Sequence, residues 1–188
     1  MRYFNQLLLA FAIAFLLTSA VCGQKSSRQV GSEVLEPVAR KTDLYPAGAD
    51  AKKEIDEALH QAAARKQRVL LVFGANWCYD CHVLDHALHE GKAGALVEES
   101  FVLVHVDIGE GDKNPELLKK YKIPLDKGVP AVVILGRDGN LLYSSAAGEF
   151  EAARSMMKKD LVKFLVNWKE SAGKKPVRLP ARQRRRNR

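Results

Sequence analysis

The sequence predicts an α/β domain in which a central mixed β-sheet is flanked by helices. Three short apolar runs, at residues 69–73, 101–108 and 131–135, are typical of strands that are buried on both faces. Segments with apolar residues at helical spacing alternate with these runs along the chain. Helices that alternate with buried strands, followed by a closing hairpin, favour helices packed around one sheet.

The first half of the domain is predicted to contain a helix, a strand and a second helix. Residues 50–66 combine good helix formers with apolar residues at helical spacing. The apolar run 69–73 predicts the first strand, which a Gly-Ala-Asn sequence ends. Helical periodicity then returns over residues 78–96, where Gly91 and Gly94 weaken the pattern.

The second half is predicted to contain a strand, a short helix, a hairpin and a final helix. The valine-rich run 101–108 predicts the second strand, and residues 115–121 a short helix with proline at a tolerated early position. The third strand, 131–135, is joined to a returning strand, 141–144, by an Arg-Asp-Gly-Asn turn. Residues 151–168 have the amphipathic pattern of a last helix.

The N-terminus has the three-part layout of a secretory signal peptide. Arg2 supplies a positive charge, residues 7–17 are apolar, and small residues follow. The apolar run is shorter than the roughly 20 residues that a membrane-spanning helix needs. We therefore expect residues 1–23 to be a signal peptide and the protein to be exported, either periplasmic or secreted. An uncleaved membrane anchor and a lipid attached at Cys22 are the alternatives.

The rest of the chain divides into three parts by composition. Residues 24–48 are polar and broken by glycine and proline, as in a linker or leading arm, and residues 49–172 form the predicted domain. Residues 173–188 hold eight Lys and Arg and no acid, so the formal net charge of +8 belongs to this tail. We expect the tail to be disordered and able to contact anionic membranes. Nucleic acid is not an expected partner, because the remainder of the chain is formally neutral and the tail has no aromatic residue.

Two cysteines mark the predicted strand-to-helix junction. Cys78 and Cys81 are separated by two residues and enclose too short a loop to be an effective structural staple. We place Cys78 in the first helical turn, where free N–H groups and the helix dipole stabilise a thiolate. Cys81 would lie one turn inward. An exposed Cys78 would attack a substrate disulfide, and Cys81 would then resolve the mixed disulfide.

Two titratable residues accompany the pair. We expect Asp80 to be a solvated acid that helps the helix N-terminus, and His82 to be an exposed helix residue. If Asp80 lies close to the sulfur, its charge opposes thiolate formation, and a protonated His82 would offset that effect.

Three other interpretations of the cysteine segment remain open. The Cys-Tyr-Asp-Cys-His sequence matches the attachment pattern of c-type haem, but it follows a buried strand and lacks the helical surroundings expected around a haem. A structural zinc site usually takes two ligand pairs, whereas the sequence has no second cysteine pair and His86, His89 and His105 are scattered. The third is an inert structural disulfide. We expect no metal and no cofactor.

Residues 73–81, Phe-Gly-Ala-Asn-Trp-Cys-Tyr-Asp-Cys, resemble the strand-to-helix junction of thioredoxin-like proteins. Gly128-Val129-Pro130, ahead of the third strand, resembles the cis-proline segment of that family, and residues 106–114 resemble an exported bacterial branch of it. The resemblance covers roughly residues 50–170. It implies a thioredoxin-like fold, with a central mixed β-sheet flanked by helices.

The resemblance also implies a role for each matching residue. Cys78 matches the nucleophile, Cys81 the resolving cysteine, and Trp77 the aromatic residue that flanks the active site. Pro130 matches the proline whose peptide bond is cis in this fold. By the same analogy, the backbone of Val129 would pair with an extended substrate peptide.

The function implied by the resemblance is that of a thiol–disulfide oxidoreductase, which reduces or exchanges protein disulfides in the cell envelope. Its partners would be protein or peptide disulfides and a membrane or soluble redox partner. The alternative is a peptide-binding module whose cysteines are structural or only anchor a partner. Val72 stands where thioredoxin has a buried acid, and Tyr79-Asp80 replaces its Gly-Pro. The direction of electron flow therefore stays open.

Overall fold

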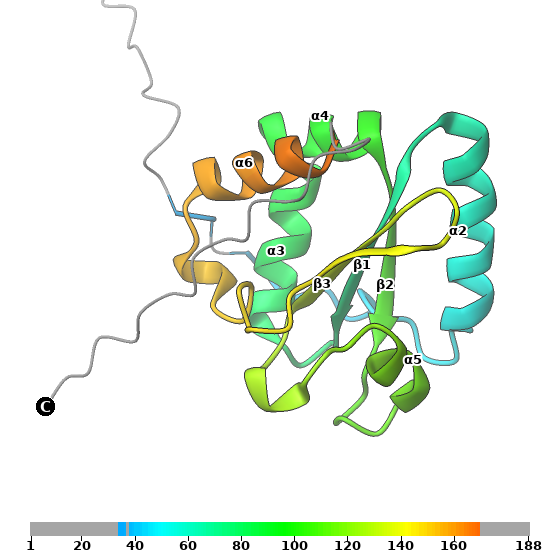
Figure 1. Ribbon diagram of the computed structural model, residues 1–188. Helices are drawn as coiled ribbons and strands as arrows, with labels where there is room; N and C mark the ends of the chain where they lie inside the picture. The colour runs from blue at the N-terminus through cyan, green and yellow to red at the C-terminus, as the bar shows by residue number, and fades with distance from the viewer. Residues whose placement is uncertain (1–33, 37, 170–188) are drawn as a thin grey trace, which may run out of the picture.

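The computed structural model of the chain describes residues 34–36 and 38–169 (Figure 1). The predicted signal peptide, Cys22 and the predicted basic tail lie outside the described residues. Within the described part, no helix is both long and apolar enough to cross a membrane. The helices and strands, labelled as in Figure 1, are α2 (Ala51–Arg65), β1 (Arg68–Gly74), α3 (Tyr79–His89), α4 (Gly91–Ser100), β2 (Phe101–Asp107), α5 (Pro115–Lys120), η1 (Leu125–Lys127), β3 (Ala131–Leu135), β4 (Leu141–Ser144), η2 (Ala153–Ser155) and α6 (Lys158–Lys169).

Four strands form one mixed sheet in the order β2-β1-β3-β4. Strand β1 is parallel to β2 and antiparallel to β3, and β4 returns antiparallel to β3. The central strand β1 is buried along almost its whole length, which accounts for its uninterrupted apolar sequence. The predicted α/β fold with a mixed central sheet is thus confirmed.

Helices cover both faces of this sheet (Figure 1). Helices α2 and α5 pack on one face, where they meet Val69, Leu71 and Phe73 of β1. Helices α3, α4 and α6 pack on the other face, against Leu70 and Val72. Side chains of β1 alternate between the two cores because a strand has a two-residue period. The C-terminal end of β1 leads from this core directly into the turn that carries the cysteines.

The single helix predicted for residues 78–96 is wrong, because the chain forms two helices there, α3 and α4. Glu90 has extended backbone between them, and Gly91 takes a positive φ of 53°. Glycine adopts that left-handed conformation at little cost. The turn is so tight that a Cβ on Gly94 would lie 2.6 Å from the carbonyl oxygen of His89. The two glycines that weaken the helical pattern are therefore those that allow the turn.

The last helix begins later than residue 151, where the periodicity placed its start. Helix α6 begins at Lys158, and only a 3₁₀ turn, η2, precedes it. Backbone groups of this segment have partners elsewhere: Leu35 donates to the carbonyl oxygen of Met156 at 2.9 Å, and Val34 forms a β-bridge with Met157. Tertiary pairing therefore takes the place of the helical hydrogen bonds that the pattern predicts.

The described part of the predicted linker or leading arm, residues 34–36 and 38–48, lies against the domain and is called the leading arm below. Leu35 belongs to the core that α6 covers. Leu44 and Tyr45 are buried beside the two cysteines. The leading arm thus contributes side chains to the same end of the sheet as the cysteine turn.

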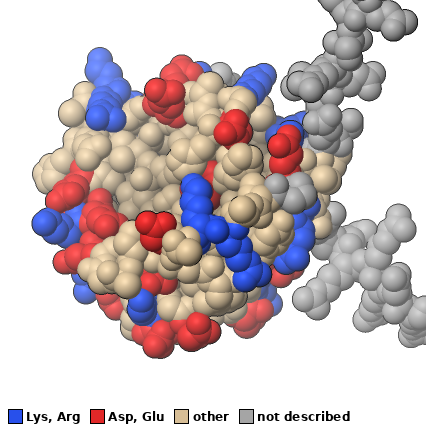
Figure 2. Space-filling model, turned by 180° about the vertical axis from the view of Figure 1, so that it is seen from behind, with Lys and Arg blue, Asp and Glu red and all other residues tan. Residues whose placement is uncertain are grey.

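Charged side chains of both signs lie on the face of the molecule that Figure 2 shows. Figure 2 shows acidic and basic residues interspersed on the face opposite to the view of Figure 1, and no continuous basic surface on it.

Candidate active site

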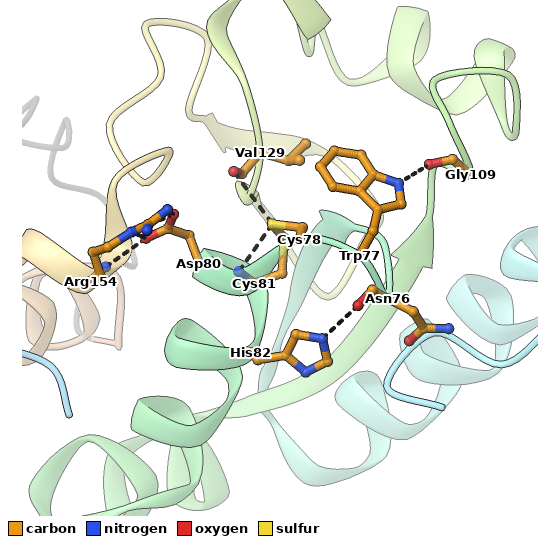
Figure 3. The surroundings of a disulfide bond; sticks show 9 residues. All are labelled: Asn76, Trp77, Cys78, Asp80, Cys81, His82, Gly109, Val129 and Arg154. Atoms are coloured by element: carbon orange, nitrogen blue, oxygen red, sulfur yellow. Dashed lines mark hydrogen bonds and ion pairs between the residues drawn. A yellow bond between two sulfur atoms is a disulfide. The ribbon is translucent and has the colours of Figure 1, made fainter. Parts of the chain in front are cut away.

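Cys78 and Cys81 are joined by a disulfide bond at the junction of β1 and α3 (Figure 3). Cys78 is the N-cap of α3 and not, as predicted, a residue of its first turn: its backbone is extended. The backbone N–H of Cys81 donates a hydrogen bond to the Cys78 sulfur at 3.1 Å. The cap position still places this sulfur at the free N–H groups and the positive dipole end of the helix. After reduction, the arrangement favours a thiolate at Cys78.

The two sulfurs differ in access. Cys81 is fully buried and only 5% of Cys78 is exposed, so the cysteine expected to be exposed is largely covered. Leu44 and Tyr45 of the leading arm pack around the pair, together with the half-buried Val129. Cys78 is nevertheless the more accessible sulfur of the two.

The segment that precedes β3 lies beside the disulfide. The Val129–Pro130 peptide bond is cis, as the family resemblance implies. The carbonyl oxygen of Val129 is 3.6 Å from the Cys78 sulfur and points toward it in Figure 3. Pairing of Ala131 with Phe73, at the end of β1, holds this segment in place. The fold thus brings Val129 and Pro130 next to a cysteine that is distant in sequence.

Trp77 forms the exposed edge of the site. Its side chain is 48% exposed, although it is one of the largest apolar groups in the chain. The indole N–H donates to the carbonyl oxygen of Gly109, at 2.9 Å, in the loop that follows β2 (Figure 3). This hydrogen bond fixes the ring next to the cysteines, so the site offers a flat aromatic surface to a binding partner.

Asp80 is not the solvated acid that the sequence suggests. It is buried, and its carboxylate accepts hydrogen bonds from the backbone N–H of Arg154 at 2.8 Å and from the Arg154 guanidinium. The guanidinium also lies 5.4 Å from the centre of the Tyr79 ring. Because Arg154 balances its charge, Asp80 can lie between the cysteines with little cost to a thiolate at Cys78.

His82 is likewise buried, and not the exposed helix residue that was expected. Its Nδ1 accepts a hydrogen bond from the backbone N–H of Lys41 at 3.2 Å. Its Nε2 lies 2.9 Å from the carbonyl oxygen of Asn76 and acts as the donor there (Figure 3). One ring nitrogen accepts and the other donates, which suits a neutral imidazole. His82 therefore links the leading arm to the turn that carries the cysteines. The negative charge of Asp80 is balanced by Arg154 and not by His82.

A buried carboxylate lies one turn further along α3. Asp85 contacts Lys41 Nζ at 2.7 Å, His105 Nε2 at 3.1 Å and His89 Nδ1 at 3.3 Å. Burial favours the neutral carboxyl, but pairing with His105 and Lys41, together with the charge of His89, outweighs burial and lowers the pKa of Asp85 to about 2. Among the residues that the structure describes, no cluster of His, Cys, Asp and Glu is arranged to hold a metal ion.

Several residues of the site were missed by reasoning from the sequence. Tyr45 lies in the segment predicted as a linker, and Arg154 in the segment predicted as a regular helix. Asn76 pairs through its side-chain amide with the backbone N–H and carbonyl of Tyr45, at 2.9 and 2.8 Å. No local pattern marks these residues, because each acts on the cysteines through a contact between distant parts of the chain.

An Arg154→Met variant is expected to slow alkylation of the reduced Cys78 at neutral pH about tenfold. The variant leaves the buried Asp80 carboxylate unbalanced near the sulfur, and a like charge disfavours the thiolate. The measurement is the rate of reaction with iodoacetamide as a function of pH. Arg40→Met is the matched control, since Arg40 also lies over the Tyr79 ring, at 5.7 Å. Equal rates in both variants would contradict the balancing role of Arg154.

Comparison with known proteins shows similarity to thioredoxin-like proteins. A family model described as thioredoxin-like matches residues 50–136. A solved structure, a disulphide isomerase from Xylella fastidiosa Temecula1, is 38% identical, with a TM-score of 0.64; the match covers 68% of this chain and 97% of that one.

Curated relatives are similar over part of their length. The thiol:disulfide interchange protein DsbD of Pseudomonas fluorescens is 31% identical over 121 residues, which cover 62% of this chain and 20% of that protein. DsbD of a Pseudomonas species is 36% identical over 93 residues, covering 48% of this chain and 15% of that protein. The chain therefore spans a fifth or less of these two relatives.

Proposed function

This chain belongs to the thioredoxin-like family, and from that premise we propose that it is a thiol–disulfide oxidoreductase that reduces or exchanges protein disulfides in the cell envelope. The observation that carries the proposal is the position of Cys78. Its sulfur caps a helix, accepts the N–H of Cys81 and is the accessible member of the pair. Such a sulfur is prepared to become a nucleophilic thiolate once the disulfide is reduced.

The proposed reaction has two steps. The Cys78 thiolate attacks one sulfur of a substrate disulfide, forms a mixed disulfide and releases the other substrate sulfur as a thiolate. Cys81 then loses its proton and attacks the Cys78 sulfur, which releases the second substrate thiolate and forms the Cys78–Cys81 disulfide. The substrate gains two electrons and the dithiol loses two. A thiol donor, the redox partner of the proposal, must reduce the disulfide before the next turnover.

Three residues are proposed to hold the substrate. Trp77 offers an exposed ring at the edge of the site, and the carbonyl oxygen of Val129 lies 3.6 Å from the Cys78 sulfur (Figure 3). Pro130 follows Val129 through the cis peptide bond. An extended peptide could align its backbone with that of Val129, as in strand addition. The peptide's disulfide would then lie over Cys78.

The cell envelope as the place of action rests on the predicted signal peptide, residues 1–23, which would direct the chain to the periplasm or outside the cell. Disulfide chemistry of secreted proteins takes place in such compartments. The relatives named for thiol:disulfide interchange support the same setting. The basic tail, residues 173–188, is proposed to hold the protein near anionic lipid.

The test is reduction of insulin disulfides with dithiothreitol as the electron source, combined with trapping. The wild-type chain should accelerate reduction. In a separate reaction with pre-reduced protein and no dithiothreitol, a Cys81→Ser variant should stop after the first step and accumulate a mixed disulfide between Cys78 and the substrate, visible on non-reducing gels and released when thiol is added. A wild-type chain that fails to accelerate reduction, together with an absence of trapped adducts, would contradict the proposal and favour a peptide-binding module.

A further inference from the structure

A buried hydroxyl next to the cysteines has no hydrogen-bond partner. Tyr45 is 1% exposed, and its hydroxyl oxygen is one of the few buried side-chain atoms in the described residues that lack a partner. A hydroxyl buried in this way destabilises the folded protein unless some state of the protein satisfies it. Tyr45 lies in the leading arm, outside the region that the family model matches.

The hydroxyl shares one small space with the sulfur of Cys81. A Cβ built on Gly74 would lie 2.3 Å from the Tyr45 hydroxyl oxygen and 2.5 Å from the Cys81 sulfur. The oxygen and the sulfur therefore cannot be further apart than the sum of those two distances. Both side chains also belong to the small apolar cluster that encloses the disulfide. Glycine at position 74 leaves the room that lets these atoms approach.

The position of Tyr45 is held from several sides. Its backbone makes two hydrogen bonds with the side chain of Asn76, in the cysteine turn. Its ring packs edge-on against His105, with 5.4 Å between the ring centres. A side chain fixed at both backbone and ring keeps its hydroxyl directed to one place.

Burial, together with nearby negative charge, keeps this hydroxyl protonated. Burial, followed by the charges of Asp85 and Asp107, raises the pKa of Tyr45 far above its ordinary value. The hydroxyl therefore acts as a hydrogen-bond donor and not as a proton acceptor at any pH at which the protein works. The titratable and charged groups that face it are Cys78 and Cys81, Asp85 of α3, and His105 and Asp107 of β2.

We propose that the Tyr45 hydroxyl donates a hydrogen bond to the Cys81 sulfur once the disulfide is reduced, and so stabilises the Cys81 thiolate that resolves the mixed disulfide. A sulfur in a disulfide is a weak acceptor, whereas a thiolate is a strong one. The hydroxyl that lacks a partner in the oxidised protein thus finds one in the dithiol. Val72 of β1, at the position where thioredoxin has a buried acid, has no polar group that could interact with the Cys81 sulfur. The inference rests on the proposed function for its place in the reaction.

The step that Tyr45 assists is the second of the two. The Cys81 thiol gives its proton to solvent or to the departing substrate thiolate, and the resulting thiolate attacks the Cys78 sulfur. Tyr45 keeps its own proton throughout. Its hydroxyl lowers the pKa of the Cys81 thiol and thereby raises the fraction of thiolate at neutral pH.

The first experiment measures the pKa of Cys81 directly. In full-length chains with Cys22→Ser and Cys78→Ser, Cys81 is the remaining cysteine, and its thiolate is followed by ultraviolet absorbance against pH. Adding Tyr45→Phe removes one oxygen and keeps the ring, and is expected to raise the pKa of Cys81 by about one pH unit, a tenfold drop in thiolate. Tyr143→Phe is the matched control, because its hydroxyl is also buried but lies in the core that α3, α4 and α6 cover, outside the cluster that encloses the disulfide.

The second experiment follows the reaction in chains that retain both Cys78 and Cys81. With Tyr45→Phe, the mixed disulfide should resolve about tenfold more slowly at neutral pH, and the rate should recover as pH rises. An unchanged pKa of Cys81, or equal changes in the two tyrosine variants, would overturn the inference. If the wild-type chain reduced no protein disulfide while the pKa of Cys81 depended on Tyr45, the proposed function would fail and the hydrogen bond would stand.

Discussion

A Cys78→Ser variant is expected to lose at least about a thousandfold of the insulin-reduction rate above the dithiothreitol background. A serine hydroxyl in the cap position accepts the same N–H of Cys81, so the turn can keep its shape. The hydroxyl is not ionised near neutral pH and forms no mixed disulfide, so the first step is blocked. The measurement is the initial rate of insulin reduction at equal protein concentration.

Cys81→Ser is the matched control for this variant. Both variants lack the disulfide and can be compared in stability with the reduced wild-type chain. Only Cys81→Ser keeps the more accessible sulfur, and it should still consume one substrate disulfide per molecule. A Cys78→Ser variant that retains most of the rate, or the reverse order of activity between the two variants, would contradict the assignment of Cys78 as the nucleophile.

An Asp85→Asn variant is expected to lose about 2 kcal/mol of unfolding free energy at neutral pH. Asp85 is 1% exposed and contacts Lys41, His89 and His105, so its ionised form is worth more in the folded protein than in water. The amide keeps the size of the side chain but not its charge. Asp126→Asn is the control, since that exposed acid pairs only with its neighbour Lys127 among the ion pairs described, and its loss should leave stability almost unchanged.

The lowered pKa of Asp85 also sets the pH at which this contribution disappears. In the unfolded chain the pKa of Asp85 returns to about 3.8, whereas in the folded chain it is about 2. Between those values the unfolded chain binds more protons, so stability falls as the pH is lowered. The contribution is complete above about pH 5 and is lost toward about pH 2. Urea unfolding at several pH values should therefore show the gap between wild type and Asp85→Asn closing over that range; a gap that stays constant would contradict the assignment.

The local pattern of the sequence was sufficient to predict most of the helices and strands. The apolar run that became β1 is buried on both faces, and such burial leaves a signal that needs no knowledge of the fold. Predicted boundaries of helices were wrong where backbone groups form hydrogen bonds with distant parts of the chain. Residues before Lys158 have helical periodicity, but the backbone N–H of Leu35 donates a hydrogen bond to the carbonyl oxygen of Met156. That carbonyl therefore pairs outside a helix.

The active-site residues likewise divide into those that the local sequence predicts and those that depend on distant contacts. Cys78, Cys81 and Trp77 lie together in one short motif, so spacing alone brings them to one place. The balance of charge around them could not be predicted, because Asp80 and its partner Arg154 are 74 positions apart. His82, expected to be exposed, is buried because Lys41, 41 positions earlier, lies over its ring nitrogen.

By itself, the sequence determined that a cysteine pair follows a buried strand and lies at the start of a helix in an α/β domain, because strand burial and helical periodicity leave patterns in neighbouring residues. Only the tertiary structure decided how that pair is surrounded. The leading arm packs Tyr45 beside the buried Cys81, and η2 brings Arg154 to the acid between the cysteines. Burial and pairing of charges depend on residues far apart in the chain, and these contacts exist only after the chain has folded.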